Sequence, residues 1–466
     1  MYDTQNDYGV ITFDGNVTTI GDWAFTNSTT LTAVAWPSAV TDIGYEAFKG
    51  CTSMTTLTVK GGSIGDNAFE NCTNLSSIDL QDGVTSIGDW AFSGCAGMSE
   101  LTLPSTVTSI GFEAFKGCTS LTKLTVNAGS IGMSAFNGCT NLSSIDLLEG
   151  VTSIGNSAFY GCAGMSELTI PSTVTNIGDK AFQDCTSLTK LKVKGGSSGL
   201  WAFANCTNLS SVDLQEGVTI IGNWAFQGCT GMKELTIPST VTSIGQEAFQ
   251  GCTSLTKLTV KGGSSGLWAF ANCTNLSSID LREGVTIIGG SAFVGCAGMS
   301  ELTIPSTVNA IGGGAFHDWE TLTKLTVKAG SIGGEAFKNC TNLNTITFGV
   351  DVTSIVNNAF SNCPNVTSVT FLGGVVLNDA SLNGIGTATS PVVLNLPYNW
   401  PTKDRPFNSA TPWHGGYFNC EYADPVKEFL GEMGEECTDC PAVEVTKGTT
   451  SIRLYSPDKV EFKKME

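Results

Sequence analysis

The stretch MSELTLPSTVTSIGFEAFKGC, Met98 to Cys118, contains the pattern from which most of this chain is built. Its first residues alternate in polarity, so that Leu101 and Leu103 face one side of an extended segment and the polar residues between them face the other. This period of two predicts a half-buried β-strand. Pro104 has no backbone N–H to donate, and we expect the strand to end there.

The second half of the stretch predicts a tight return of the chain. Val107 and Ile110 are two further apolar positions, on a second extended segment. Gly111 follows them, and we expect it to adopt a backbone conformation that is costly for other residues. Ala114 and Phe115 are then predicted to lie on a short helical or 3₁₀ turn that buries the aromatic ring.

The Ala-Phe dipeptide recurs sixteen times along the chain. Its Phe residues stand at positions 25, 48, 69, 92, 115, 136, 159, 182, 203, 226, 249, 270, 293, 316, 337 and 360. The intervals of 23 and 21 residues make a three-unit block of 67, and KGGSSGLWAFANCTNLSS occurs identically at 194–211 and 261–278. A unit of this length cannot bury its own apolar face, whereas stacked units can. The sequence therefore predicts a strand-dominated α/β repeat solenoid of about sixteen 21- or 23-residue units.

The duplicated stretch departs from the other short units at one core position. Those units contain GSIG, with a buried Ile such as Ile131, whereas the two copies contain GSSG, with Ser198 and Ser265. Two residues later the copies have Leu200 and Leu267. Because a bare Ile-to-Ser change would leave a cavity and an unsatisfied hydroxyl, we expect the Leu to turn inward and refill the core.

Composition excludes several classes of protein. The chain of 466 residues lacks a Gly-X-Y period, and 41% of it is hydrophobic in a regular pattern, so it is neither collagen-like nor disordered. A net charge of −19 argues against nucleic acid and anionic lipid as partners. No stretch of 18 apolar residues occurs, and we predict no membrane insertion.

Residues 170–185, IPSTVTNIGDKAFQDC, show the unit almost in full. Together with the preceding strand, the units follow LxxLxIPxxVTxIGxxAFxxC, which resembles the BspA-like leucine-rich-repeat family of bacterial and protist surface proteins. The resemblance covers about residues 10–372. It implies a curved, right-handed leucine-rich-repeat superhelix, and adhesion to host proteins or cell surfaces.

A cysteine follows the Phe by three residues in fourteen of the sixteen units, and Ser28 and Trp319 take its place in the others. A catalytic cysteine is usually single and lies beside a base, whereas this one is repeated and the chain has two His. Zinc needs four converging ligands, and one thiol per unit forms a line. The pattern predicts a ladder of buried, unpaired thiols with a packing role, with disulfides between adjacent units as the alternative. Its central members are Cys95, Cys118, Cys139, Cys162, Cys185 and Cys206.

The outward positions of the first strand carry charges in a fixed order. One unit of each block has Glu, the next has Lys and the third has Ser with Asp. The candidate binding face consists of Glu100, Lys123, Asp146, Glu167, Lys190, Asp213, Glu234 and Lys257. We expect each Glu to lie one strand from a Lys. The face is either a solvated surface whose charges set the register, or a flat docking surface for an extended protein or glycan.

Tryptophan occurs repeatedly two residues before the Phe. Trp201, Trp224 and Trp268 form a candidate aromatic strip, and because Lys180 occupies the same position in another unit, we expect the position to be partly exposed. Stacking on sugars or docking of a partner is one interpretation. Lateral packing against a neighbouring loop is the other.

The repeat period ends after Cys363. We predict an N-terminal tail (1–9), the solenoid (10–372), a capping segment (373–425), and a small tail domain with a short helix and strands (426–466). The segment VVLNL, 392–396, is typical of a strand within the cap.

The C-terminal part also holds the only residues with a metal-like composition. These are His414, Cys420, Cys437 and Cys440. Their spacing matches no zinc pattern, which favours a disulfide or free thiols over zinc. No phosphate-binding loop, catalytic triad or nucleotide fingerprint occurs, and we predict neither a metal nor another cofactor.

We therefore predict a non-enzymatic, monomeric binding protein whose partners are host or neighbouring-cell surface proteins or glycans. A purely structural spacer or stalk of the cell surface is the alternative. The N-terminus, MYDTQNDYGV, has neither the basic nor the apolar segment of a signal peptide, so the chain is either cytoplasmic or begins after a removed signal.

Overall fold

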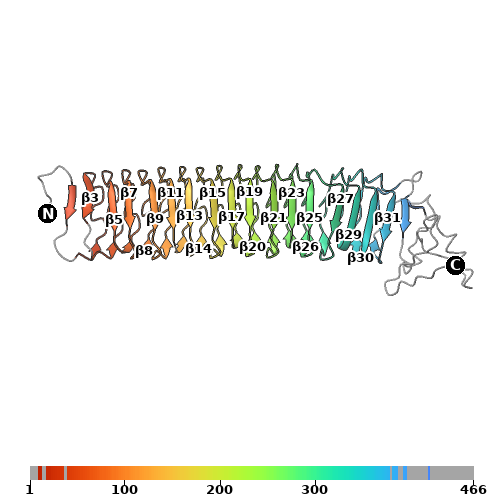
Figure 1. Ribbon diagram of the computed structural model, residues 1–466, viewed down its shortest axis with the longest axis horizontal. Coiled ribbons are helices and arrows are strands. Elements are labelled where there is room, and N and C mark those ends of the chain that lie inside the picture. Colours follow the sequence, from red (N-terminus) through yellow and green to blue (C-terminus); the bar gives the residue numbers. More distant parts are fainter. Residues whose placement is uncertain are drawn as a thin grey trace, which may run out of the picture. The chain divides into compact units, whose positions relative to one another are not determined.

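The computed structural model describes residues 9–12, 17–35, 39–127, 129–377, 380–386, 392–395 and 418–419. The described residues form parallel strands joined by turns and contain no helix. The chain forms two units, Met1–Leu255 and Thr256–Glu466. Within each unit the chain winds in coils that stack through their strands (Figure 1). The predicted strand-dominated repeat solenoid is confirmed, and its right-handedness stays a prediction.

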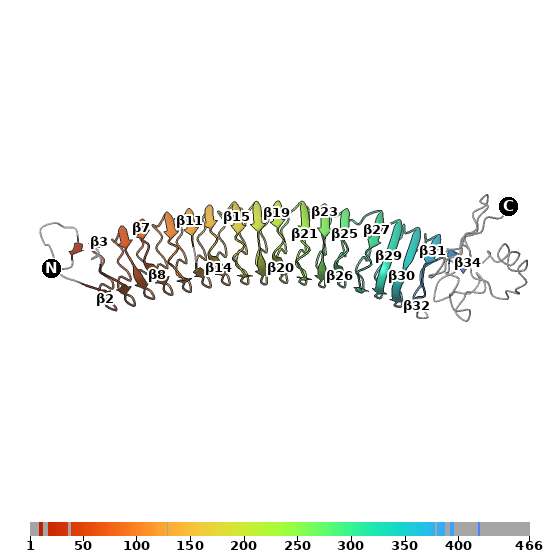
Figure 2. The same cartoon turned by 60° about the horizontal axis from the view of Figure 1, so that its bottom comes forward.

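Each coil contributes a strand to each of two rows, which Figure 2 shows along opposite sides of the coils. In the first unit, one row contains β1 (Gly9–Thr12), β3 (Leu31–Ala35), β5 (Thr56–Val59), β7 (Ser77–Leu80), β9 (Glu100–Leu103), β11 (Lys123–Val126), β13 (Ser144–Leu147), β15 (Glu167–Ile170), β17 (Lys190–Val193), β19 (Ser211–Leu214) and β21 (Glu234–Ile237). The other contains β2 (Thr19–Ile20), β4 (Asp42–Ile43), β6 (Gly62–Ile64), β8 (Val84–Ile87), β10 (Ser109–Ile110), β12 (Gly129–Ile131), β14 (Val151–Ile154), β16 (Asn176–Ile177), β18 (Gly196–Ser198), β20 (Val218–Ile221) and β22 (Ser243–Ile244).

The second unit repeats this arrangement. Its strands are β23 (Lys257–Val260), β24 (Gly263–Ser265), β25 (Ser278–Leu281), β26 (Val285–Ile288), β27 (Glu301–Ile304), β28 (Ala310–Ile311), β29 (Lys324–Ile332), β30 (Thr345–Ile355), β31 (Ser368–Phe371), β32 (Val376–Leu377), β33 (Val392–Asn395) and β34 (Phe418–Asn419). Strands β29 and β30 each run continuously through both rows. Strand β33 pairs with β31, as the VVLNL segment predicts. The expected helix at 426–437 and the rest of the tail domain lie outside the described residues, and the proposed domain limits stay predictions.

The strands of the second row pair in register from coil to coil, whereas those of the first row pair within three-stranded sheets such as β9–β11–β13. In β9, Leu101 and Leu103 are buried and the residues between them are exposed, as the alternation predicts. Leu124 of β11 pairs with Leu101 on one side and with Ile145 on the other. The strand β9 ends at Leu103, directly before Pro104. Every core position therefore lies beside its equivalent in the neighbouring coil.

A column of stacked phenylalanine rings runs through the core of each unit. The rings of Phe48 and Phe69 have centroids 5.2 Å apart and planes 3° apart, an offset stack that fills the core. The column of the first unit consists of Phe25, Phe48, Phe69, Phe92, Phe115, Phe136, Phe159, Phe182, Phe203, Phe226 and Phe249. That of the second consists of Phe270, Phe293, Phe316, Phe337 and Phe360.

The Phe lies on a run of reverse turns, and the helical turn expected at Ala114 and Phe115 is wrong. Within the coil, the N–H of Lys116 donates to the carbonyl of Glu113 at 3.1 Å, and that of Cys118 to Phe115 at 3.3 Å. Glu113 has φ of 52°, in the left-handed region, which prevents a continuous helical turn. The position two residues before the Phe has a positive φ in all sixteen coils.

The N–H groups of the residues that alternate with these turn donors along the chain point to the next coil. Those of Glu113, Phe115 and Gly117 donate to carbonyls of the following coil at 3.0, 2.7 and 2.9 Å. The turn thus alternates hydrogen bonds within the coil with hydrogen bonds between coils. Each coil is joined to its neighbour along the second strand row and along the turn, and within three-stranded sheets such as β9–β11–β13 along the first row as well, which satisfies most of its backbone donors.

The role expected for Gly111 is wrong as well. Its φ is not in the left-handed region, but an added Cβ would lie 2.5 Å from the carbonyl carbon of Gly88 in the preceding coil. Glycine is required there because the two backbones approach closely. Left-handed glycines occur instead at other positions, such as Gly129 of a short unit, which has φ of 89° and whose Cβ would lie 2.6 Å from the carbonyl oxygen of Val107.

The serines of the duplicated stretch are accommodated without the predicted inward leucine. Leu267 is 48% exposed and Leu200 is only half-buried. The Ser198 hydroxyl accepts a hydrogen bond from the N–H of Gly222 at 3.2 Å, and Ser265 accepts from the next coil in the same way. In a GSIG unit the carbonyl of Ile131 takes the equivalent N–H, that of Gly155. The side chain of serine replaces a main-chain acceptor, so the hydroxyl is not left unsatisfied.

We predict that Ser198→Ala lowers the free energy of unfolding by about 1 kcal/mol, because the Gly222 N–H loses its acceptor. Urea unfolding followed by circular dichroism measures the change. Ser198→Ile, which restores the residue of the GSIG units, is the control and is expected to be at least as stable as the wild type. An alanine variant as stable as the wild type would show that the hydroxyl bond contributes nothing.

Candidate functional site

The charged rows of the first strand face lie as the sequence predicts. Lys123 pairs with Glu100 across β11 and β9, with Nζ and Oε2 4.0 Å apart. Lys190 pairs with Glu167, with Nζ and Oε1 2.7 Å apart. The four side chains are between 58% and 68% exposed, so each ion pair is solvated and weakly held.

Asp146 and Asp213 belong to a neighbouring row on the same face. Asp146 lies opposite Thr125, and Asp213 lies opposite Lys192, whose Nζ is 3.4 Å from its Oδ2. The structure thus brings the Glu and Lys residues together and places the Asp residues two positions further along the strand.

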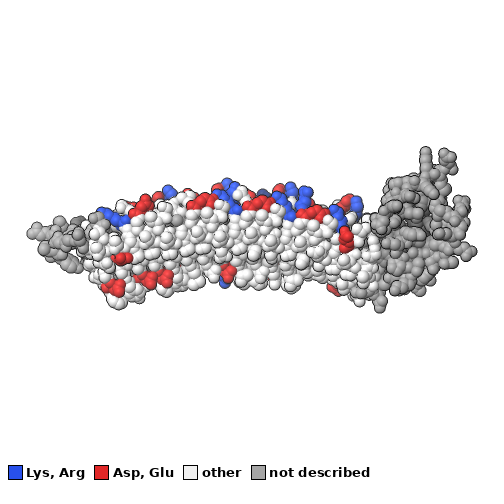
Figure 3. Space-filling view, turned by 90° about the horizontal axis from the view of Figure 1, so that it is seen from below, with Lys and Arg blue, Asp and Glu red and all other residues white. Residues whose placement is uncertain are grey.

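The second unit continues the same pattern. Glu301 and Lys324 pair across β27 and β29, with Nζ and Oε2 3.4 Å apart. Glu234 and Lys257 occupy the equivalent strand positions, but one belongs to the first unit and the other to the second. In each unit most of the charged side chains gather along one edge in the view of Figure 3, and the broad surface toward the viewer carries few charged side chains.

A further charged network, which the sequence interpretation missed, lies beyond the ends of these strands. Lys194 Nζ is 2.8 Å from Glu149 Oε1, and the Ser172 hydroxyl donates to the other oxygen of Glu149. Lys194 and Ser172 hold the pKa of Glu149 below its usual value. Glu283 and Lys328 repeat the contact in the second unit. The 67-residue period is the signal that would have revealed it.

Two of the three tryptophans of the candidate aromatic strip lie in contact. The rings of Trp201 and Trp224 stack with centroids 4.5 Å apart, and Lys180 Nζ lies 5.4 Å from the centre of the Trp201 ring. Both faces of Trp201 are therefore covered by its neighbours, and only ring edges reach solvent. Trp268, in the second unit, is 40% exposed. These contacts are the lateral packing that the sequence left as one of two interpretations.

The cysteine column is buried and hydrogen-bonded. All fourteen repeat cysteines are buried, and none of them forms a disulfide within the described part of the chain. The thiol of Cys72 donates to the carbonyl of Phe48 in the preceding coil at 3.2 Å, and Cys95 donates to Phe69 in the same way. The column thus pairs a weak donor with a buried carbonyl while filling a small apolar space.

Trp319 takes over this role in the one coil that has tryptophan at the cysteine position. Its indole N–H donates to the carbonyl of Phe293 at 3.1 Å, and its ring packs edge-on against Phe316. The shared property of cysteine and tryptophan here is an N–H or S–H donor on a side chain that is otherwise apolar. The sequence alone gave no indication of this donor requirement.

Burial suppresses ionisation of the thiols. It raises the pKa of Cys51 to about 11, and that of Cys72 and of Cys139 to about 12. Since the thiolate is the nucleophile and the metal ligand, these cysteines are inert in the folded chain. The described residues contain no group of three or more potential metal ligands. His414, Cys420, Cys437 and Cys440 lie outside the described part of the chain.

The fold and the sites together define a leucine-rich-repeat solenoid. The family model of the BspA type leucine rich repeat region matches residues 5–122, 62–189, 196–323 and 264–377. The chain belongs to this family, which is a family of repeat proteins and not of enzymes. No curated protein matches the chain.

Several solved structures are similar. A leucine-rich repeat protein from Bacteroides ovatus is 24% identical, with a TM-score of 0.47 over 71% of this chain and 87% of that one. A leucine-rich cell surface protein from Faecalibacterium prausnitzii is 27% identical, with a TM-score of 0.32 over 57% and 83%. The pneumococcal vaccine antigen PcpA is 16% identical, with a TM-score of 0.30 over 82% and 80%. In the described residues, no helix is long and apolar enough to cross a membrane.

We predict that the solenoid loses stability as the pH rises. An unfolded cysteine has a pKa of about 8.5, and burial raises that of Cys72 and Cys139 to about 12. The folded state therefore keeps protons that the unfolded state loses, so the stability from these thiols is complete below about pH 8.5 and decreases toward about pH 12. Thermal unfolding measured between pH 7.5 and 10.5 tests this.

The matched control is Cys72→Ala with Cys139→Ala, which should flatten the decrease in melting temperature over the same pH range. An equal slope in the variant and the wild type would contradict a contribution from these thiols.

Proposed function

We propose that this protein is a non-enzymatic interaction scaffold at a cell surface, and that the charged strand face binds an extended segment of a partner protein. The observation that carries the proposal is the row of exposed, alternating Glu and Lys side chains on β9, β11, β15 and β17. Each pair is solvated, so a partner's charges can replace the internal ones at little cost.

The regular spacing of the row supports an extended partner. Glu100 and Glu167 are three coils apart, which is roughly 14 Å at about 4.8 Å per strand. A partner with charges along an extended segment meets several equivalent pairs at once, and each added contact strengthens binding through effective concentration. The described face has no aromatic anchor on these strands, which favours many weak contacts over one hot spot.

Surface location belongs to the same proposal. Membership of the family supports it, and the similar protein from Faecalibacterium prausnitzii is itself described as a cell surface protein. The competing proposal is a structural spacer, which the mutual pairing of the charges supports, because a surface that neutralises itself sets the strand register without any partner.

A binding screen against extracellular-matrix proteins tests the scaffold, with two charge-swapped pairs as the key variant. Glu100→Lys with Lys123→Glu and Glu167→Lys with Lys190→Glu preserve the net charge and the internal ion pairs but invert the pattern offered to a partner. We expect at least a tenfold loss of affinity for any protein that the wild type binds.

The control variant swaps Glu113 and Lys116, an ion pair of 2.8 Å on the turn side of a coil. It should bind like the wild type. If no protein binds above background, the spacer is favoured, and if the strand-face swap leaves binding intact, this face is not the docking surface.

A further inference from the structure

Three consecutive coils of the second unit lack a side chain where every other coil has one. The position three residues before the buried Phe is Gly290, Gly313 and Gly334 in these coils, and a larger residue in the other thirteen. None of the three glycines has a positive φ, and a Cβ at Gly313 would meet only the carbonyl oxygen of Gly334, at 3.1 Å. Thirteen coils carry a side chain at this position, so the repeat does not require glycine there, and the missing side chains at Gly313 and Gly334 open space beside them.

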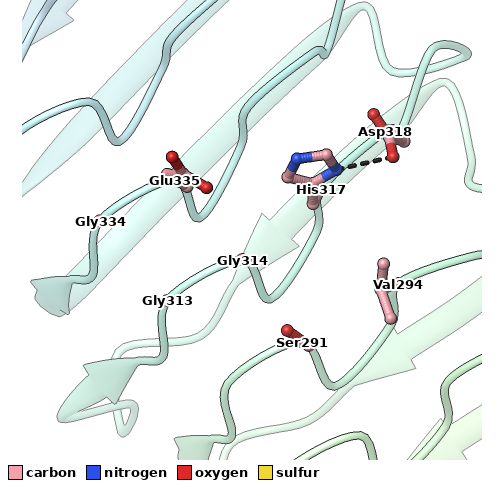
Figure 4. A pocket seen from close by; sticks show the side chains of 8 residues that line it. All are labelled: Ser291, Val294, Gly313, Gly314, His317, Asp318, Gly334 and Glu335. Atoms are coloured by element: carbon pink, nitrogen blue, oxygen red, sulfur yellow. Dashed lines mark ion pairs between the residues drawn. The ribbon is translucent and has the colours of Figure 1, made fainter.

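That space is a hollow of about 460 Å³, which lies within the range of ~300–1,000 Å³ of small-molecule sites. Figure 4 shows it crossing three coils, with Gly313, Gly314 and Gly334 along one side and side chains from each coil around it. Ser291 and Val294 come from the first coil, His317 and Asp318 from the second, and Glu335 from the third. His317 Nδ1 lies 2.7 Å from Asp318 Oδ2 but without the geometry of a hydrogen bond.

The glycines also leave backbone donors open along the hollow. In coils that have Asp or Asn at this position, the side chain caps the equivalent N–H of the next coil, as Asp66 Oδ1 does for Asp89 at 2.8 Å and Asp179 Oδ1 for Leu200 at 2.8 Å. Glycine has no such oxygen. Within the described part of the chain, the N–H groups of Gly313 and Gly334 donate to no acceptor.

Where Asp or Asn stands at this position, the amide of the next coil binds an oxygen from within the protein, and in this hollow the same amide is available to an oxygen from outside. Successive amides are one coil apart, roughly 4.8 Å, which is about the length of one pyranose ring. Asp318 and Glu335 add carboxylate acceptors at the rim, where their side chains are 52% and 51% exposed.

We propose that this hollow is a binding site for a neutral saccharide. Each sugar hydroxyl is both a donor and an acceptor, so it can accept from the glycine amides and donate to the carboxylates of Asp318 and Glu335. The hollow's own apolar groups, such as Val294, suit the C–H faces of a pyranose ring. The site is separate from the charged strand face and extends the binding function to a second class of ligand.

The charge of the hollow selects against the alternatives. An anionic ligand would use the amides but meet the carboxylates of Asp318 and Glu335, of which only Glu335 is paired with a lysine, Lys338 at 3.2 Å, and the exposed Asp318 repels it. A basic peptide would pair with the carboxylates but has no acceptor on its cationic groups for the amide row. A neutral ligand rich in hydroxyls satisfies both sides of the hollow with the same kind of group.

The test uses the full chain and a panel of neutral oligosaccharides, namely glucose, mannose, galactose and N-acetylglucosamine oligomers, with a sulfated oligosaccharide and an oligolysine peptide as comparisons. Gly313→Asp is the key variant, because its carboxylate would cap the Gly334 amide as Asp66 caps Asp89. We expect one or more neutral oligosaccharides to bind the wild type, and Gly313→Asp to weaken that binding at least tenfold by calorimetry.

Met133→Asn is the matched control, since it adds the same kind of capping side chain at the same position of a coil in the first unit. It should leave saccharide binding unchanged, and equal melting temperatures would show that both variants fold. The proposal is overturned if no neutral oligosaccharide binds, if Gly313→Asp binds as the wild type does, or if only the sulfated sugar or oligolysine binds. Swapping the strand-face charges should not affect saccharide binding, so failure of this site and failure of the scaffold are distinguishable.

Discussion

The structure depends on the in-register hydrogen bonding of each coil to the next. Because the second strand row and the turn are paired from coil to coil within each unit, and the first row within three-stranded sheets, a side chain lies beside its equivalent one coil away. Like then stacks on like, which suits Phe rings and thiols that donate to a carbonyl. The same stacking would be unfavourable for charged side chains, because a repeat of one unit would place Glu beside Glu. The three-unit block avoids this by placing Lys123 beside Glu100 and Ser144 beside Lys123.

The same register explains which positions vary. The residue two before the Phe must tolerate a left-handed backbone, yet it points outward, so Trp, Glu, Lys, Ser and Asn all occur there. The conformation costs each of these residues something, and the hydrogen bonds from its neighbours hold it in place. Adjacent copies of this position necessarily lie side by side. Trp201 and Trp224 stack for this reason, and the stack needs no ligand to account for it.

The repeat, the strand alternation and the Glu–Lys pairing could all be predicted from the sequence, because each follows from a period that the residues themselves display. The details of the turn could not. The residue in the left-handed conformation at Glu113 is not a glycine, so composition gave no signal, and Gly111 is required by a close approach of two coils that only the packed structure contains. The acceptor role of Ser198 likewise depends on a neighbour 24 residues away in sequence.

In an array of near-identical coils, departures from the pattern carry the most information about specific function. The coil around Phe316 departs in two ways at once. On the outside, Gly313 and Gly314 replace the side chains that other coils carry and open the hollow. On the inside, Trp319 replaces cysteine and fills the core beneath the turn while keeping the donor to the carbonyl of Phe293. The buried Trp319 ring fills the core at the coil where the outer side chains are missing, and a backbone held in place before binding spares a ligand the cost of ordering it.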